Sequence, residues 1–402
     1  MRILHIGKYY PPVPGGMERF LGDLVEAQRA AGHDVLVLAH AHPRSSGAAG
    51  PDWVQRVPVW LRLIFTPISP AFPFWLRRAI RDFKPDVIHI HMPNVSAFWA
   101  LMLPSAARVP WLIHWQSDIE QSKLSLRLAY PPYSMFEHAL LDRAEAIIAT
   151  SPQYLDASRP LAPWKTKCHV IPLGAAPSRL PEMEATAGDG LWTGQGLRVL
   201  AVGRLTYYKG FETLIAALRD DDSKQLVIVG EGEERARLER LLAGNSARNV
   251  RLAGEVDDAT LHRLMASCDV FCLPSRERTE AFGIVLLEAM RYAKPIVASR
   301  LEGSGVTWVA REGQNALLAT PLDAQSWRNA LDTLAAAPAK RALLGRLGHQ
   351  RYLREFDIAD VGRRVEAIYA QLLRARAPDA VEAHDAAHDD VGDTNHTARA
   401  TP

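Results

Sequence analysis

Cysteine is scarce in this chain of 402 residues, which contains only Cys168, Cys268 and Cys272. An odd and sparse set argues against a disulfide framework and is typical of a reducing compartment. Cys268 and Cys272 belong to the apolar stretch CDVFCLP. We expect both to be small core residues rather than metal ligands.

Long hydrophobic runs are also missing. The nearest candidate for a membrane span, residues 95–115, is interrupted by Pro104, Arg108 and Pro110, so we expect no transmembrane helix. The N-terminal MRILHIG enters a strand without a signal-peptide pattern. The net charge of +2 gives no polyelectrolyte character that would attract nucleic acid. These absences predict a cytoplasmic protein that binds no nucleic acid.

Short apolar strands alternate with helices through most of the chain, a pattern typical of parallel sheets covered by helices. The pattern restarts near residue 197. ILHIGK at 3–8 and VLAVGR at 199–204 both read as a strand, a glycine and a cation before a loop and a helix. We predict an α/β fold with two Rossmann-like domains that face each other across a cleft. In such sheets ligands bind beyond the carboxyl ends of the strands.

The expected boundaries are a first domain at 1–175, a Gly/Pro-rich linker at 176–196, a second domain at 197–356 and a final helix at 357–377. The tail at 378–402 holds six acidic residues, one Arg and no Leu, Ile or Phe, which predicts disorder. Three tail histidines could bind a metal, although we favour a solvated tail; they are His384, His388 and His396.

Two carboxylates eight positions apart, Glu280 and Glu288, stand out in ERTEAFGIVLLEAMRYAKPIVAS. Between them a glycine turn should start a helix near Phe282 or Gly283 that runs to about Tyr292. Backbone amides at a helix start bind anions, and carboxylates accept hydrogen bonds from sugar hydroxyls. An arbitrary pair of glutamates would more often be a solvated surface pair, so the other loops decide.

The first loop of the second domain, GRLTYYKG, carries Gly203, Arg204 and Lys209 at the end of a strand and before a helix. Two fixed cations there could stabilise the charge of a departing diphosphate without a metal. An ordinary charged surface loop would look the same. Glu231 lies in the GEG turn after the strand LVIVG, where glycines let a ligand approach the backbone.

Two first-domain loops offer further candidates. PPVPGGMERF places Gly15 and Gly16 at a helix entrance, which suits a phosphate or sugar contact, and Glu18 follows them. HWQSD follows the strand WLIH, whose end should aim His114 into the cleft. His114 or Asp118 could contact sugar hydroxyls or assist proton transfer. A structural hydrogen-bonding role is the alternative for His114.

The stretch 60–84 mixes aromatic and basic side chains, which fits either an interfacial membrane contact or a core-packed helix with a basic face. Its members are Trp60, Ile64, Phe65, Phe72, Phe74 and Trp75 with Arg62, Arg77, Arg78, Arg81 and Lys84.

Taken together, these motifs resemble glycosyltransferase family 4 in order and spacing. The residues that carry the resemblance are GGME at 15–18, Gly-Arg204-x4-Lys209-Gly, the GEG turn and Glu280-Ala-Phe-Gly-Ile-x3-Glu288, and it covers about residues 1–375. HWQSDI, ATSPQYL, IPLG and SRERTEAFGIVLLEAM are similar to a bacterial subgroup that contains O-antigen mannosyltransferases. The segment EGSGVTWV at 302–309 departs from many family members, which puts transfer of the sugar identity in doubt.

The resemblance implies the GT-B fold, a final helix that crosses back to the first domain, retention of anomeric configuration and no obligatory metal or cofactor. It further implies roles for single residues. Arg204 and Lys209 would bind the donor diphosphate, and Glu288 the ribose. Glu280 would contact the donor sugar as a positioning residue, not as a nucleophile. The backbone amides near Gly283 and Ile284 would assist in binding the donor, and His114 would contact its sugar. Gly16 would approach the donor phosphates or the acceptor.

We therefore expect transfer of a hexose, mannose from GDP-mannose, onto a lipid-linked glycan of bacterial surface polysaccharide (O-antigen or exopolysaccharide). Such an enzyme would be peripheral on the cytoplasmic face of the inner membrane, with Glu18 and Asp118 on the acceptor side. The alternatives are a UDP-hexose or dTDP-rhamnose donor, a GT-B sugar-nucleotide epimerase, or a non-catalytic nucleotide-binding subunit.

Overall fold

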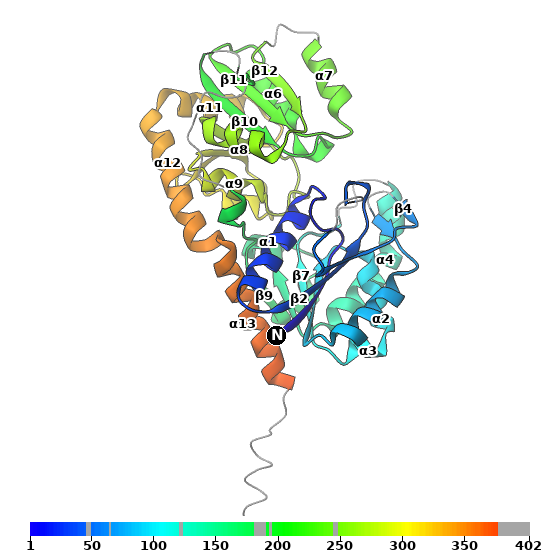
Figure 1. The fold of residues 1–402 in the computed structure, drawn as a ribbon. Coiled ribbons are helices and arrows are strands. Elements are labelled where there is room, and N and C mark those ends of the chain that lie inside the picture. The colour runs from blue at the N-terminus through cyan, green and yellow to red at the C-terminus, as the bar shows by residue number, and fades with distance from the viewer. Residues whose placement is uncertain are drawn as a thin grey trace, which may run out of the picture.

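The computed structural model describes residues 1–45, 50–63, 66–119, 124–180, 190–192, 195–243 and 248–376. Ile64, Phe65, much of the predicted linker and the predicted tail with its three histidines lie outside the described residues. Two lobes follow one another along the chain, as Figure 1 shows, with the blue-to-cyan part below and the green-to-yellow part above.

The first lobe is built on a seven-stranded parallel sheet in the order β3-β2-β1-β6-β7-β8-β9. Apolar side chains on both faces explain why it is covered by helices. Its strands are β1 (Arg2–Ile6), β2 (Asp34–His40), β3 (Val54–Val57), β6 (Val87–Met92), β7 (Trp111–Trp115), β8 (Ala146–Ala149) and β9 (Cys168–Val170). Its helices are α1 (Gly16–Ala30), α2 (Phe72–Phe83), α3 (Pro104–Ala107), α4 (Leu124–Arg143) and α5 (Pro152–Ala157), and β4 (Leu61–Leu63) pairs with β5 (Thr66–Ile68) in a hairpin.

The second lobe contains a six-stranded parallel sheet in the order β12-β11-β10-β13-β14-β15. Its strands are β10 (Leu197–Val202), β11 (Lys224–Val229), β12 (Val250–Gly254), β13 (Val270–Leu273), β14 (Ile296–Ser299) and β15 (Ala316–Ala319). Its helices are α6 (Phe211–Leu218), α7 (Arg235–Ala243), α8 (Asp258–Ser267), α9 (Val285–Arg291), α10 (Val306–Val309), α11 (Ala324–Ala336) and α12 (Pro338–Arg351). The predicted α/β fold with two Rossmann-like parallel sheets is confirmed.

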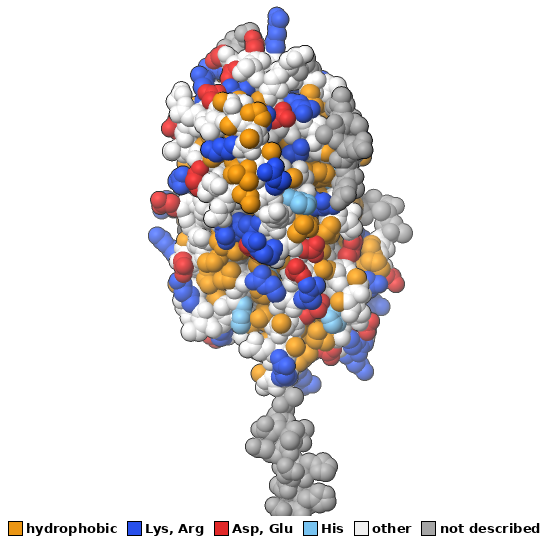
Figure 2. Space-filling model, turned by 90° about the vertical axis from the view of Figure 1, so that its left-hand side faces the viewer, with side chains coloured by type: hydrophobic (Ala, Val, Ile, Leu, Met, Phe, Trp, Pro, Cys, Tyr) orange, Lys and Arg blue, Asp and Glu red, His pale blue; other side chains and the backbone are white. Residues whose placement is uncertain are grey.

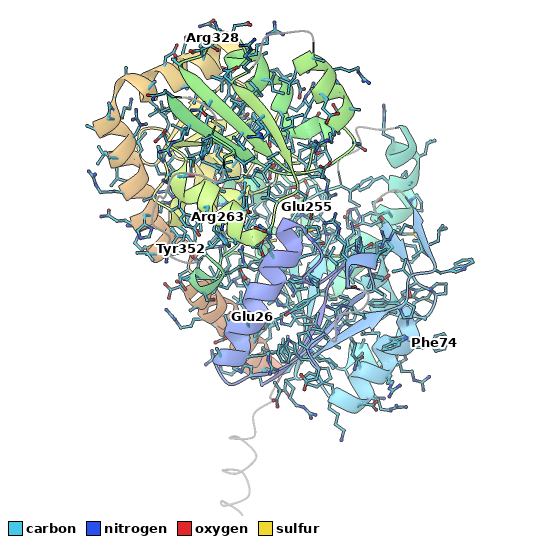
Figure 3. All side chains as sticks on the ribbon, turned by 45° about the horizontal axis from the view of Figure 1, so that its top comes forward. Glu26, Phe74, Glu255, Arg263, Arg328 and Tyr352 are labelled. Atoms are coloured by element: carbon cyan, nitrogen blue, oxygen red, sulfur yellow. The ribbon has the colours of Figure 1, made fainter. Side chains whose placement is uncertain are left out.

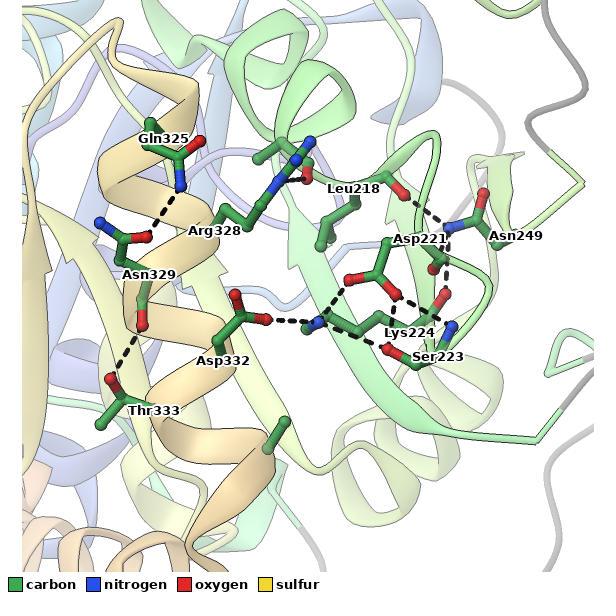
Figure 4. A network of polar contacts seen from close by, with 12 residues as sticks. Leu218, Asp221, Ser223, Lys224, Asn249, Gln325, Arg328, Asn329, Asp332 and Thr333 are labelled. Carbon is green, nitrogen blue, oxygen red and sulfur yellow. Dashed lines mark hydrogen bonds and ion pairs between the residues drawn. The ribbon is translucent and has the colours of Figure 1, made fainter.

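A buried cation at the start of β11 fixes α11 to the second sheet. Lys224 donates to Asp221 at 2.5 Å and pairs with Asp332 of α11 at 2.6 Å (Figure 4). Asn249 adds hydrogen bonds to the carbonyl oxygens of Leu218, Asp221 and Lys224. This network is structural, because it lies at the start of β11 and not at its carboxyl end.

The last helix returns to the first lobe, as expected. In Figure 1, α12 and α13 (Ile358–Arg376) form a long path down one side of the molecule. Between them Tyr352, labelled in Figure 3, donates its hydroxyl to the carbonyl oxygen of Ala175 at 2.9 Å. On α13, the Tyr369 hydroxyl accepts from Gln28 of α1 and contacts His89 Nδ1 at 2.6 Å. The crossing helix is thus anchored inside the first lobe.

Both sheets reverse their strand order beside their first strand, between β1 and β6 and between β10 and β13. Ligand crevices form at such switch points, beyond the carboxyl ends of the strands. The two crevices face each other: Arg44, after β2, pairs with Glu255, after β12, at 2.5 Å. Figure 3 shows Glu255 at this junction, next to the start of α1.

The charged side chains and the cysteines of the described residues lie where the composition predicts. Figure 2 shows basic, acidic and hydrophobic side chains intermingled over the face that it displays. Cys268 and Cys272 are buried and unpaired, as predicted, and Cys168 is half-buried. Within the described residues, no helix combines the length and the apolar character that a membrane crossing requires.

Candidate functional site

The centre of the site is a buried ion pair between Lys209 and Glu280. Lys209 Nζ donates to Glu280 Oε2 at 2.5 Å, and Ser275 Oγ donates to the same oxygen at 2.9 Å. Lys209 follows β10 and Ser275 follows β13, so the pair spans the switch point of the second sheet. Burial by itself lowers the pKa of Lys209, but the Glu280 carboxylate outweighs it and holds that pKa above its ordinary value. Lys209 is therefore a fixed cation, already matched by one carboxylate.

The second predicted cation behaves differently. Arg204 is exposed and, within the part of the chain that the structure describes, forms no ion pair. Its charge reaches the first lobe, where it adds to the effect of burial in lowering the pKa of Lys8 and opposes the burial that raises the pKa of Glu18. Arg204 is thus free to bind an anion between the lobes. Lys209 could bind the same anion only while it remains paired with Glu280.

Lys8 is a candidate that the sequence-based list omits. One glycine separates it from β1, as one glycine separates Arg204 from β10, so the two cations occupy equivalent places at the two switch points. Burial lowers the pKa of Lys8, with Glu18 opposing and Arg204 adding to this effect. The signal was present in the parallel between ILHIGK and VLAVGR.

Glu18 lies opposite these cations on the first turn of α1. Burial raises its pKa, although its own backbone amide, Lys8 and Arg204 pull it down. A small cavity opens here, at the carboxyl ends of β1, β6 and β7. Its lining residues are Gly7, Lys8, Tyr9, Met17, Glu18, Leu21, His91, Pro93 and Gln116.

His114 does not face the cleft as expected. It lies inside β7 rather than at its end, is 0% exposed, and neither ring nitrogen has a partner among the described residues. Its ring packs against Phe20, with centroids 4.9 Å apart, because α1 covers this face of the sheet. Burial lowers the pKa of His114 to about 3, so the ring is neutral. The expected orientation of His114 into the cleft is therefore not seen, and its sugar contact stays a prediction.

Glu288 joins the two lobes. Its Oε1 accepts from Arg19 of α1 at 3.0 Å and from Arg179 at 3.3 Å, while Oε2 accepts from no other described residue. Arg179 also pairs with Asp23 at 3.0 Å. Glu288, which is predicted to bind the ribose, therefore has a partner among the described residues on only one of its carboxylate oxygens. Glu280 shows the same pattern, since both of its described partners reach Oε2.

Asp118 has a structural environment. Its Oδ1 accepts from Trp115 Nε1 at 2.8 Å and from Ser158 Oγ at 2.7 Å. Its Oδ2 accepts from Arg278 at 2.9 Å, across the lobes. With both oxygens engaged, Asp118 holds the second lobe against the first, and its predicted acceptor contact is not tested by this arrangement.

The predicted glycines lie at the junction of the lobes. A β-carbon at Gly16 would lie 2.9 Å from Ile284 Cγ2, so the close approach of α1 to the second lobe requires glycine. Gly283 has φ +74 and turns the chain into α9, which begins at Val285. Gly15 precedes α1 directly, and a β-carbon at Gly203 would lie 3.3 Å from Lys209 Nζ.

Two further segments border the site. Glu231 accepts from Arg235 at 2.5 Å on the partly exposed rim of the second lobe. The segment at 302–309, which departs from the sequence of many family members, forms hydrogen bonds to the loop that contains Glu280. There Ser304 Oγ donates to the Glu280 carbonyl oxygen at 2.5 Å, and the Gly305 amide donates to that of Ala281 at 2.8 Å.

A separate apolar surface lies on the first lobe around α2 and the β4–β5 hairpin. Trp60 is 79% exposed and Phe74 is 75% exposed. Phe74 lies at the outer edge of the lobe in Figure 3. The opposite face of α2 is packed in the core through Phe72, Leu76, Ala79 and Ile80. A groove of about 310 Å3 runs beside it, lined by Ile68, Ser69, Pro70, Val95, Ser96, Phe98, Trp99, Met102 and Phe136.

Comparison with protein families gives two matches that divide the chain between the lobes. Residues 15–174 match the family described as Glycosyl transferase 4-like domain, and residues 187–351 match Glycosyl transferases group 1.

Individual proteins match over most of their length. D-rhamnosyltransferase WbpZ of Pseudomonas aeruginosa is 31% identical over 368 residues, which are 89% of this chain and 92% of the relative. O-antigen chain mannosyltransferase C of Escherichia coli is 27% identical over 83% of this chain and 88% of its own. The structure of sucrose-phosphate synthase from Thermosynechococcus elongatus superposes with a TM-score of 0.77 at 24% identity, covering 93% of this chain and 99% of that chain. The last match concerns the fold alone.

Proposed function

Because the chain belongs to the group 1 glycosyltransferases and has their GT-B fold, we propose that it moves mannose from GDP-mannose onto a lipid-linked glycan with retention of configuration. The observation that carries the proposal is the Lys209–Glu280 pair at one switch point, with the unpaired Arg204 beside it and Lys8 opposite. This set supplies cations for a diphosphate and carboxylate oxygens for hydroxyl groups.

In the proposed complex, the donor lies between the lobes. The diphosphate sits by Arg204 and Lys209, and the free Oε1 of Glu280 accepts from a sugar hydroxyl. The ribose reaches the free Oε2 of Glu288, whose Oε1 stays with Arg19 and Arg179. No metal or other cofactor has a role in this arrangement.

The proposed chemistry uses no protein nucleophile. Glu280 is a poor one, because the Lys209 cation and the Ser275 hydroxyl already stabilise the negative charge of its carboxylate through Oε2. The acceptor hydroxyl attacks the anomeric carbon from the face that the diphosphate leaves, and the leaving phosphate takes its proton. Lys209 and Arg204 stabilise the charge that grows on that phosphate. One such donor typically contributes about 3 kcal/mol to the transition state.

A 6-deoxyhexose donor is the second candidate, because one relative is a D-rhamnosyltransferase. D-Rhamnose is D-mannose without the hydroxyl at C6. A site that hydrogen-bonds this hydroxyl would reject the deoxysugar by roughly 10⁴-fold, whereas an apolar site would discriminate weakly.

Donor hydrolysis and calorimetric binding with GDP-mannose, UDP-glucose and dTDP-rhamnose test the proposal. We expect GDP release from GDP-mannose, with Glu280→Gln weakening turnover. Conversion of the sugar without nucleotide release would indicate an epimerase. Binding without turnover of any donor, in the presence of a lipid-linked glycan, would indicate a non-catalytic subunit. Either result would overturn the proposed reaction.

We further propose that the apolar surface of the first lobe contacts the cytoplasmic face of the inner membrane, where a lipid-linked acceptor resides. The support is the exposure of Trp60 and Phe74 beside the exposed Arg77. Aromatic side chains at a lipid interface and cations at anionic headgroups favour such binding. Arg78 and Arg81 contribute less, because both pair with Asp82.

A further inference from the structure

Three histidines from two neighbouring strands meet beneath the small cavity of the first lobe. His89 and His91 are two positions apart on β6, so both side chains point to the same face of the sheet, which α1 and α13 cover. His5 of β1 is the in-register partner of His89. One ring nitrogen from each lies within 4.8 Å of the other two, and all three side chains are buried. Within the described residues, no other His, Cys, Asp or Glu side chains form such a group of three.

Each imidazole has a separate partner on its other nitrogen. His5 Nε2 contacts Gln28 Oε1 at 2.8 Å, and His89 Nδ1 contacts the Tyr369 hydroxyl at 2.6 Å. His91 Nδ1 contacts the Gln116 side-chain amide at 3.1 Å. Metal-binding histidines typically bind the ion through one ring nitrogen and form a hydrogen bond through the other. That outer hydrogen bond fixes the tautomer and the orientation of the ring.

The inner nitrogens are poorly satisfied by protein alone. His89 Nε2 is buried and has no hydrogen-bond partner among the described residues. His5 Nδ1 and His91 Nε2 lie 3.0 Å apart. That hydrogen bond requires a proton on His91 Nε2, with the Gln116 amide donating to Nδ1, and it leaves Gln116 Oε1 buried and unpartnered. Turning the amide lets Oε1 accept from Nδ1–H and moves the NH₂ group to the position of the unpartnered oxygen. It frees the lone pair of His91 Nε2, which then faces the lone pair of His5 Nδ1, an arrangement that a cation between the two nitrogens would stabilise. The two orientations of an amide are distinguished only by such bonding.

We propose that His5, His89 and His91 form a binding site for one divalent transition metal ion, with Zn²⁺ as the best fit. Zn²⁺ binds imidazole nitrogen at about 2.0–2.1 Å in a tetrahedral arrangement, which places ligand nitrogens roughly 3.3 Å apart. The 3.0 Å between His5 Nδ1 and His91 Nε2 is close to this spacing. The fourth position is left for a water molecule or another small ligand on the side of the cavity, which His91 lines.

Such an ion would have a structural effect. It would tie β1 to β6 and, through Tyr369, hold the crossing helix α13 to the first sheet. The site does not depend on the proposed sugar transfer, which routes no step through a metal. The competing account is a row of neutral histidines joined by hydrogen bonds, with His89 Nε2 left unsatisfied.

The test uses the full chain, purified without a histidine tag and with the tail histidines His384, His388 and His396 replaced by serine. The protein is stripped with a chelator and titrated with Zn²⁺ against a chromophoric competitor. Co²⁺ serves as a second probe, because its visible absorption reports tetrahedral nitrogen coordination. We expect one equivalent to bind and the Tm to rise with added Zn²⁺.

Three variants locate the ion. His5→Gln removes one of three ligands and should abolish binding of one equivalent. Tyr369→Phe keeps the packing of the ring but removes the outer hydrogen bond, and should weaken binding by roughly 10- to 100-fold. His40→Gln is the matched control. This buried histidine of β2 bonds Lys8 and Ser96 away from the trio, so its loss should leave the affinity unchanged.

Each outcome decides the proposal. Absence of stoichiometric binding in the stripped protein overturns it in favour of the row of neutral histidines. Equal binding by the parent, His5→Gln and Tyr369→Phe proteins places the ion elsewhere and also overturns it. If His5→Gln fails to fold, the affinity of Tyr369→Phe relative to His40→Gln still decides. Sugar transfer is not a readout, so failure of the proposed function would leave this result interpretable.

Discussion

Replacing Lys209 by alanine separates the chemical role of this cation from its structural one. Lys209 is buried, and its removal leaves the Glu280 carboxylate with Ser275 as its remaining described partner. Breaking a buried ion pair by deleting one partner destabilises a protein by about 3–5 kcal/mol. For domains of this size that corresponds to a fall in Tm on the order of 10 °C.

Turnover should fall independently of stability. If Lys209 stabilises the leaving diphosphate, Lys209→Ala lowers kcat by roughly 10²–10³-fold, measured well below the lowered Tm with saturating donor. The double variant Lys209→Ala with Glu280→Gln leaves no unpaired charge at this position. It should therefore regain much of the lost stability while kcat stays low, which is the signature of coupled neighbours in a double-mutant cycle.

Lys224→Ala provides the matched control. Lys224 is a buried lysine at the start of β11 that pairs with Asp221 and Asp332, as Figure 4 shows. Its loss should lower the Tm in the same way and leave kcat unchanged. A folded Lys209→Ala protein that turns over its donor at the wild-type rate would refute the role in charge stabilisation. Recovery of kcat in the double variant would instead show that a misplaced Glu280 caused the defect.

Three further predictions address the lobe junction, pH and the membrane. Gly16→Ala should lower kcat because its β-carbon meets Ile284 Cγ2, and adding Ile284→Ala should restore it. Burial raises the pKa of Glu137 from 4.5 to about 7, so the folded protein holds a proton that the unfolded chain has released. Stability should therefore fall as the pH rises from about 4.5 to about 7, by roughly 3 kcal/mol at most, and Glu137→Gln should remove this loss in denaturant titrations. Replacing Trp60 and Phe74 by serine should weaken co-flotation with anionic vesicles by roughly tenfold or more, because each ring contributes about 1.5–3 kcal/mol on burial.

Each of these predictions has its own control and contrary result. Gly362→Ala on α13 adds a β-carbon at ordinary contact distance and should be tolerated, and failure of Ile284→Ala to rescue would reject the steric explanation. A Glu137→Gln protein with an unchanged pH profile would reject the buried proton. Leu322→Ser removes an exposed apolar side chain from the second lobe. If this change weakened flotation as much as the double change on the first lobe, the proposed membrane surface would be wrong.

Local features of the site were predictable because they depend on short stretches of chain. The order of strand, glycine, cation, loop and helix, predicted at the start of both domains, is seen from β1 to α1 and from β10 to α6. The helix after Gly283 begins within three residues of its expected start. Apolar periodicity, and glycines where the backbone turns sharply, fix such elements regardless of what packs on them.

The partners of the charged side chains were not predictable in this way. Lys209 and Glu280 are 71 positions apart, and both were predicted to meet the donor separately, although the structure joins them. Asp118 and Arg278 are 160 positions apart. Ion pairs of this kind depend on how two domains approach each other, and no local pattern records that approach.

The sequence by itself determined two parallel-sheet domains, the crossing helix and the family, because alternating strands, loop glycines and motif spacing are properties of contiguous residues. Only the tertiary structure decided that His114 is buried, that Glu280 and Glu288 each have one carboxylate oxygen without a partner among the described residues, and that Lys8 faces Arg204. Burial and electrostatic partnership arise when distant segments exclude water from the same space, and the field of a charge is set by whichever groups share that space.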